Sequence, residues 1–191
     1  MRKYIAQSFL LIFLFLAALL PLAAQRPPQD KSKRPSPPGT AALTFADGKK
    51  ISIEYSRPKI RDPKTGQPRK IMGGVVPYGQ VWRTGANEAT SFTTEADLTV
   101  GGTSVPAGQY TLYTLPSETS WKLIISKKTG QWGIPYPGEQ DDLARIDMKK
   151  ETLKNTVDPF TITLEKRGGD AGVLKIAWEK TQASVDFSEK K

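Results

Sequence analysis

The residues with the clearest chemical potential lie in residues 76–90, which read VPYGQVWRTGANEAT. A turn at TGAN would bring Arg83, Asn87 and Glu88 together, because glycine adopts backbone angles that other residues avoid. A guanidinium, an amide and a carboxylate can bind a carboxylate, a sugar hydroxyl or a peptide end. This segment is therefore the first candidate for a ligand site.

The same segment also has a purely structural interpretation. In the binding interpretation, Tyr78 and Trp82 form aromatic walls beside the polar residues. In the structural one, Arg83 pairs with Glu88, Asn87 bonds its own loop, and Trp82 closes one end of the fold. The residue types alone leave both interpretations open.

A second aromatic segment, residues 132–138, reads WGIPYPG. Trp132 and Tyr136 can form a stacking platform for a sugar ring, or they can hold a loop against the body. Glu139, Asp142 and Arg145 follow closely. The spacing does not match a calcium loop and Arg145 opposes a cation, so we expect an acidic loop that is either solvated or paired with Arg145. No metal site is predicted.

An enzymatic alternative uses Glu88 and Asp142 as a pair of carboxylates. Glycoside hydrolysis needs two such groups about 5–10 Å apart. The chain has no His and no Cys, so no Ser-His-Asp triad, Cys-His nucleophile or disulfide can form. A general base would have to be a carboxylate, Lys or Tyr. No cofactor is predicted.

The N-terminus predicts export to the periplasm or secretion. Arg2 and Lys3 precede an apolar run over residues 9–20, and small residues follow. This pattern predicts a signal peptide, residues 1–24, cleaved after Ala24 and leaving no stable membrane span. An uncleaved anchor is the alternative, although a bilayer span needs about 20 apolar residues.

The next segment, residues 25–39, reads QRPPQDKSKRPSPPG and predicts a disordered, proline-rich leader. It carries part of the formal charge of +9. Much of the remaining positive charge lies in a basic loop, residues 57–74, which could meet an anionic glycan or phospholipid or simply face water. No nucleic-acid partner is expected, because this distribution does not demand one. A protein partner is not indicated.

From residue 40 onward, short alternating apolar runs are separated by Gly and Pro turns. Ile51, Ile53 and Tyr55 alternate after an Asp-Gly turn, and residues 110–115 are apolar on both faces. Eight or nine short strands are expected, with residues 149–155 as the one candidate for a helical turn. The pattern predicts an all-β protein: a single domain over residues 40–188, folded as a two-sheet antiparallel β-sandwich.

Three strings carry a family resemblance: VPYGQVWRTGANEAT, VPAGQYTLYTLP and WKLIISK with QWG beyond it. Over residues 51–185 the chain resembles the domain of unknown function 2911 family, which consists of exported bacterial proteins without an assigned activity. The resemblance implies a functional surface at the signature positions Tyr78, Trp82, Arg83, Gly85, Ala86, Asn87, Glu88 and Thr90. It also places an Asp and an Arg near Asp142 and Arg145, which suggests that these residues join Glu88 in one pocket.

The leading hypothesis is therefore an exported binding module for a small polar ligand, a glycan or a peptide end. The carboxylate-dependent hydrolase and a structural envelope protein are its alternatives. The expected ligand-binding residues are Tyr78, Trp82, Arg83, Asn87, Glu88, Trp132, Asp142 and Arg145.

Overall fold

The computed structural model describes residues 30–191. The predicted signal peptide and residues 25–29 of the leader lie outside the described residues. The strands are β1 (Pro38–Thr44), β2 (Lys50–Ser56), β3 (Thr90–Thr94), β4 (Leu98–Val100), β5 (Thr103–Val105), β6 (Gly108–Pro116), β7 (Trp121–Ser126), β8 (Asp142–Lys166) and β9 (Ala171–Glu189). Two short 3-10 helices, η1 (Lys31–Lys33) and η2 (Glu139–Asp141), complete the elements. Within residues 30–191, no helix has the length and apolarity needed to cross a membrane.

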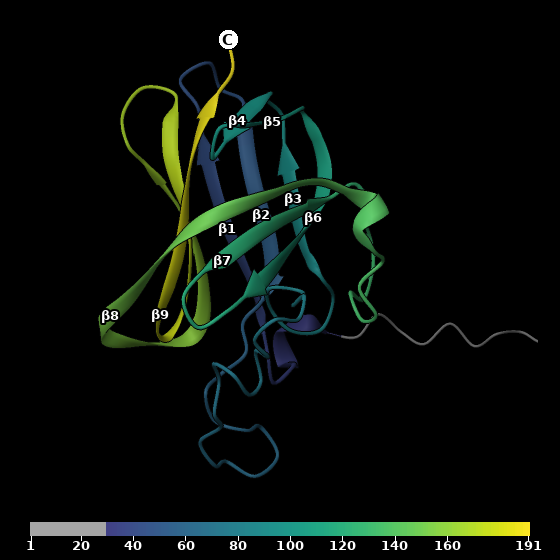
Figure 1. Cartoon of the computed structure of the whole chain (residues 1–191), viewed down its shortest axis with the longest axis vertical. Helices are drawn as coiled ribbons and strands as arrows, with labels where there is room; N and C mark the ends of the chain where they lie inside the picture. Colours follow the sequence, from purple (N-terminus) through teal and green to yellow (C-terminus); the bar gives the residue numbers. More distant parts are fainter. Residues whose placement is uncertain (1–29) are drawn as a thin grey trace, which may run out of the picture.

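The all-β prediction is confirmed. Hydrogen bonds join the nine strands in the order β1-β2-β3-β6-β7-β8-β9-β4-β5, and every pairing is antiparallel. This is one large sheet, so the separation into two sheets that a sandwich requires is not confirmed. Figure 1 shows β7 and the first half of β8 crossing in front of β1 and β2, so the sheet curls over its own apolar side.

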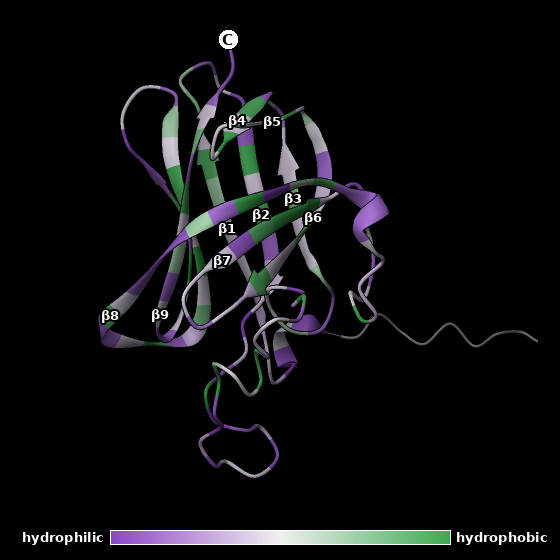
Figure 2. Cartoon of the chain, viewed as in Figure 1, coloured by the Kyte–Doolittle hydropathy of each residue, from purple (hydrophilic) through white to green (hydrophobic). Residues whose placement is uncertain are grey.

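The core lies inside this curl, and the alternation of the sequence places it there. On β2, Ile51, Ile53 and Tyr55 are buried, whereas Glu54 between them is exposed. The predicted central strand is confirmed as β6, where Leu112 and Tyr113 are both buried although they point to opposite faces. Figure 2 shows the same alternation of apolar and polar bands along the strands.

The last two strands are longer than the sequence predicted. The separate short strands expected around residues 141–149, 160–164, 174–178 and 185–187 join into β8, of 25 residues, and β9, of 19 residues. The helical turn expected at residues 149–155 is wrong. Lys149 to Thr152 pair with Thr181 to Ser184 of β9, and this cross-strand ladder keeps the backbone extended.

The leader also differs from its prediction. The sequence predicted disorder through residue 39, but β1 begins at Pro38, and Arg34, Ser36 and Pro37 contact the body. The Pro37 carbonyl accepts a bond of 2.8 Å from the Arg57 N–H, and the Ser36 carbonyl accepts one of 3.0 Å from Asn87. Proline lacks an N–H, so this segment is held through its carbonyl oxygens and side chains. We call residues 30–37 the leader strap.

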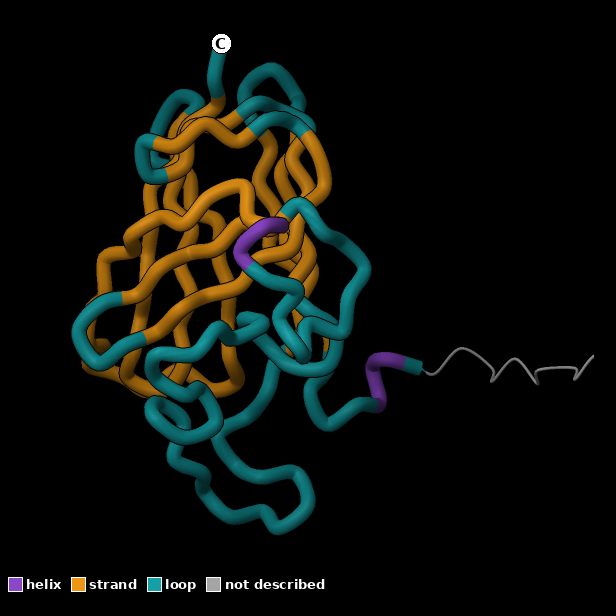
Figure 3. The backbone as a smooth tube through the Cα atoms, turned by 45° about the vertical axis from the view of Figure 1, so that its right-hand side comes forward, coloured by secondary structure: helices purple, strands orange, loops and turns teal. Residues whose placement is uncertain are grey.

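Between β2 and β3 the chain makes a long excursion, residues 57–89. Figure 3 shows loops gathered at one end of the sheet, below the strands. Trp82 fastens this excursion to the sheet by an antiparallel bridge to Thr114 at the end of β6, with N···O distances of 2.8 and 2.9 Å. The signature segment therefore sits on the rim of the core.

Candidate functional site: a basic cavity beside the signature segment

Trp82 belongs to the core as well as to the signature segment. It is 8% exposed, stacks on Trp178 with ring centroids 6.2 Å apart, and meets Phe160 and Trp121 edge-on at 5.2 and 6.4 Å. Such aromatic contacts add to the large apolar area that each ring buries. The structural role considered for Trp82 is therefore observed, and its outer edge also lines a cavity.

The turn that follows Trp82 is held by hydroxyl groups. Thr84 and Asn87 both adopt positive φ angles, 56° and 57°. Thr84 Oγ1 lies 3.2 Å from the carbonyl oxygen of Trp82, and Thr90 Oγ1 donates to the carbonyl of Thr84 at 2.7 Å. A side chain at Gly85 would approach the Ser56 carbonyl oxygen to 3.0 Å. Thr84 Oγ1 also lies 3.2 Å from Thr114 Oγ1 on β6, so this part of the signature shapes the loop and fastens it to the sheet, while Gly85 lines the cavity described below.

Arg83 points to the outer side of the turn. Its guanidinium lies 5.4 Å from the ring centroid of Trp132, and Nη1 donates to the Trp132 carbonyl at 3.3 Å. Trp132 itself is 55% exposed. Burial lowers the pKa of Arg83 below its usual value, and the charge of Glu88 partly offsets this; arginine remains a cation at neutral pH.

A cavity of about 660 Å³ opens beside Arg83. Trp82 and Trp178 form its aromatic side, and residues from the basic loop, the leader strap, the signature segment and the loop of Trp132 also line it. The charged residues around it are five cations and one carboxylate: Lys33, Lys59, Arg61, Arg69, Arg83 and Asp62. We call it the Arg83 cavity.

Most of these cations lack a carboxylate partner. Within residues 30–191, no ion pair involves Lys59, Arg61, Arg69 or Arg83. Arg61 donates to the Gly66 carbonyl at 2.9 Å, and Arg69 donates to the carbonyls of Ile60 and Lys59 at 3.3 and 2.6 Å. These bonds orient the side chains, and each guanidinium has five N–H donors in all. These four cations therefore carry positive charge that no acidic side chain among the described residues neutralises by direct contact.

The nearby carboxylate Asp62 is occupied by its own loop. Its Oδ1 accepts bonds from the backbone N–H groups of Lys64 and Thr65 at 2.8 and 3.0 Å. These bonds lower the pKa of Asp62, with a smaller contribution from the charge of Arg69. Asp62 thus acts as a turn residue inside the basic loop.

Asn87 and Glu88 face the leader strap. Asn87 Nδ2 donates to the Ser36 carbonyl at 3.0 Å and to Ser56 Oγ at 3.1 Å. Glu88 accepts from Arg34 Nη1 at 2.9 and 2.7 Å, and Lys31 Nζ lies 3.5 Å away. The hydrogen bond from Arg34 lowers the pKa of Glu88. The pairing of Arg83 with Glu88 that the structural interpretation expected is absent among the described contacts.

Asp142 and Arg145 form a separate group, the Arg145 cluster. Arg145 contacts Asp142 at 2.7 Å, Glu139 at 3.0 Å and the Tyr136 hydroxyl at 3.1 Å, and that hydroxyl also donates to Asp142. Burial and the bond to Asp142 raise the pKa of Tyr136 to about 12, and burial raises that of the adjoining Tyr113 to about 12. Tyr136 therefore has the loop-fastening role that was one of its two predicted alternatives.

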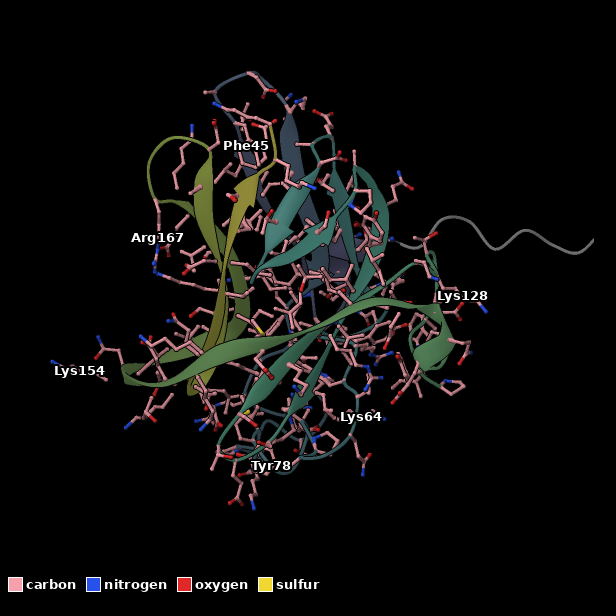
Figure 4. The ribbon with its side chains drawn as sticks, turned by 45° about the horizontal axis from the view of Figure 1, so that its top comes forward. Phe45, Lys64, Tyr78, Lys128, Lys154 and Arg167 are labelled. Carbon is pink, nitrogen blue, oxygen red and sulfur yellow. The ribbon has the colours of Figure 1, made fainter. Side chains whose placement is uncertain are left out.

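Tyr78 lies apart from the cavity lining. Burial raises its pKa, with contributions from the charges of Glu118 and Glu179. Figure 4 shows Tyr78 and Lys64 at the end of the molecule opposite Phe45. Of the eight expected site residues, Trp82, Arg83 and Trp132 come together beside the cavity. Asn87 and Glu88 hold the leader strap, and Asp142 and Arg145 form a separate cluster. Tyr78 is in none of these three groups.

Several cavity residues were not among those expected. Lys59, Arg61 and Arg69 belong to the basic loop, whose run of positive charge was the available signal. Trp178 on β9 reaches the cavity through the curl of the sheet, for which the sequence holds no local signal. Among residues 30–191, no group of three or more acidic side chains is arranged to hold a metal ion.

The family model described as a protein of unknown function, DUF2911, matches residues 36–187. The chain belongs to this family. The predicted resemblance is thereby confirmed, and the DUF2911 match includes the signature segment, the basic loop and the Arg145 cluster. It begins at Ser36, so Lys33 and Arg34 of the leader strap precede it. No curated protein and no solved structure matches the chain significantly.

Proposed function

We propose that this protein is an exported binding module for a small anionic ligand, held in the Arg83 cavity. The observation that carries the proposal is the set of four cations around one cavity with no ion pair among the described residues. A carboxylate or phosphate group would supply the missing charge, and a guanidinium can bind either in a bidentate manner. A peptide carboxyl end and an acidic sugar both fit this class.

The aromatic side of the cavity supports a ligand with an apolar or planar part. Trp82 and Trp178 line it, and Arg83 lies over the exposed ring of Trp132. Ligand sites commonly combine such apolar surfaces with a few fixed polar groups, within volumes of about 300–1,000 Å³. The volume of about 660 Å³ lies inside that range.

The hydrolase alternative receives no support from the geometry. Glu88 is bonded twice by Arg34, which lowers its pKa and keeps it ionised, whereas a general acid needs a raised pKa. Asp142 is engaged by Arg145 and Tyr136 in another cluster. The two carboxylates thus have separate partners and no shared opening among those described.

The test is a titration of the purified protein with pyrophosphate, citrate and galacturonate at constant ionic strength, with glucose as the neutral ligand. Binding to the native state at a hundredfold excess over Kd adds about 2.7 kcal/mol to the free energy of unfolding. We expect at least one anion to raise the Tm and glucose to have no effect. Arg83→Ala should abolish the shift and leave the Tm of the free protein nearly unchanged.

Arg167→Ala is the matched control, because Arg167 is exposed and pairs with Asp186 away from the cavity. It should bind the same anion as the wild type. Absence of any anion effect, or an equal loss in both variants, contradicts the proposal. A large drop in the Tm of the free Arg83→Ala protein would favour the structural alternative.

A further inference from the structure

The leader strap forms one side of the Arg83 cavity. Lys33, Pro35 and Ser36 all line it, opposite residues of the basic loop and the signature segment. Lys33 is the one cation that the strap contributes to the lining. Its own pairing with Asp30 spans 3.8 Å between two exposed side chains, and such a contact is worth little in water.

Two signature residues hold the strap in this place. Glu88 binds Arg34 through both carboxylate oxygens, and the Arg34 side chain is only 15% exposed. Asn87 holds the Ser36 carbonyl and the Ser56 hydroxyl with the same amide group. Neither Asn87 nor Glu88 lines the cavity.

We propose that Glu88 and Asn87 are positioning residues, which hold the leader strap as a wall of the Arg83 cavity so that Lys33 faces the bound anion. This inference rests on the anion-binding function proposed above. It explains why a carboxylate sits beside a cavity that attracts anions: the carboxylate is neutralised by Arg34 and Lys31 of the strap. Lys33 and Arg34 precede the matched family region, whereas Ser36, which Asn87 holds, lies within it.

The charge of Glu88 makes the inference testable, because removing it has two opposite effects on the affinity for an anion. Burial lowers the pKa of Arg83 and the negative charge of Glu88 partly offsets this, so the field of Glu88 reaches the cavity and also opposes an incoming anion. If Glu88 acted only through its charge, Glu88→Gln would tighten anion binding. If Glu88 holds the wall, the same variant loses the strap and its Lys33, and binding weakens.

The experiment compares the wild type, Glu88→Gln and Glu54→Gln. Glu54 is an exposed carboxylate on β2. It lines, together with Glu88, a second groove that is separate from the Arg83 cavity, and among the described residues it forms no ion pair. It therefore reproduces the change in charge without disturbing the strap. The first readout needs no ligand: the rate of tryptic cleavage after Lys31 and Lys33. The second is the Kd for pyrophosphate and for citrate.

We expect Glu88→Gln to be cleaved faster in the strap and to bind the anion about twofold to fivefold more weakly, as for the loss of one exposed charge contact. Glu54→Gln should be cleaved like the wild type and bind equally or more tightly. An unchanged cleavage rate, or unchanged or tighter binding by Glu88→Gln, overturns the inference. A wild-type protein that binds no anion overturns the proposed function instead, and this is seen before any variant is compared.

Discussion

Two arginines, each with an aromatic residue from the same loop, behave in opposite ways in this molecule. Arg145 meets Asp142, Glu139 and the hydroxyl of Tyr136, all within 3.1 Å. Arg83 lies over Trp132 and, among the described residues, its guanidinium donates one hydrogen bond, to a backbone carbonyl. The first side chain has partners for its charge inside the protein, and the second has none among the described carboxylates.

This difference distinguishes the structural role of Arg145 from the binding role proposed for Arg83 more clearly than residue type does. A charge that is paired and hydrogen-bonded holds two segments of chain together, here the loop after β7 and the start of β8. A cation in a cavity without a carboxylate partner can still gain energy from an incoming anion.

The largest effect is expected in the Arg145 cluster. Asp142→Ala leaves Arg145 with the exposed carboxylate of Glu139 as its one acidic partner among the described residues and removes the acceptor of the Tyr136 hydroxyl. The Asp142 side chain is 7% exposed, so we expect a loss of about 2–3 kcal/mol in the free energy of unfolding. Urea denaturation measures it.

Asp147→Ala is the control for that variant. Its carboxylate is 81% exposed and pairs only with Lys122, so its loss should cost less than about 0.5 kcal/mol. Equal losses in the two variants would remove the distinction between a structural cluster and a surface pair. Anion binding should be unchanged in both.

Tyr136→Phe is expected to have the next largest effect. It removes one hydroxyl that bonds both Asp142 and Arg145, at a cost of about 1–2 kcal/mol. Tyr78→Phe is its control, because no hydrogen bond of the Tyr78 hydroxyl is present among the described residues. The measurement is the Tm of both variants. A drop in Tm for Tyr78→Phe as large as that for Tyr136→Phe would contradict the stabilising role of the Tyr136 hydroxyl.

Alkaline pH should weaken the Arg145 cluster. The pKa values of Tyr136 and Tyr113 are raised to about 12 in the folded protein, whereas an unfolded tyrosine titrates near 10. The folded state therefore holds its protons more tightly, and the stability is fully present below about pH 10 and declines as the pH rises toward 12. Thermal melts from pH 9 to 12 should show a steeper decline for the wild type than for Tyr136→Phe, and parallel curves would argue against this linkage.

The smallest change in stability is expected for Trp132, the aromatic residue that contacts Arg83. Trp132→Ala removes an exposed ring whose contact with Arg83 is worth about 0.5–1 kcal/mol. We expect a small drop in Tm and a weakening of anion binding of about twofold to fivefold, measured by titration with citrate. A drop in Tm as large as that of Tyr136→Phe would show that the two aromatic residues do not differ in role.

Much of the fold could be read from local patterns. The alternation of Ile51, Ile53 and Tyr55, and the apolar faces of residues 110–115, predicted strands that the structure contains at β2 and β6. The long hairpin of β8 and β9 was not predicted. Residues 149–155 have no apolar alternation of their own, and their extended backbone depends on pairing with β9. The ordered part of the leader was not predicted for a similar reason. The leader contacts Asn87 and Glu88, which are remote from it in the sequence.

The sequence by itself determined the all-β class, the family and the segment around which the site is built, because strand periodicity and a long signature string are local properties. Only the tertiary structure decided the partners of each charge. In the tertiary structure Trp82 is part of the core, and Arg61 and Arg69 line the same cavity as Arg83. Glu88 pairs with Arg34, and Asp142 pairs with Arg145. Coulomb energies depend on distance and burial, and the curl of a nine-stranded sheet sets both between residues that are remote in the sequence.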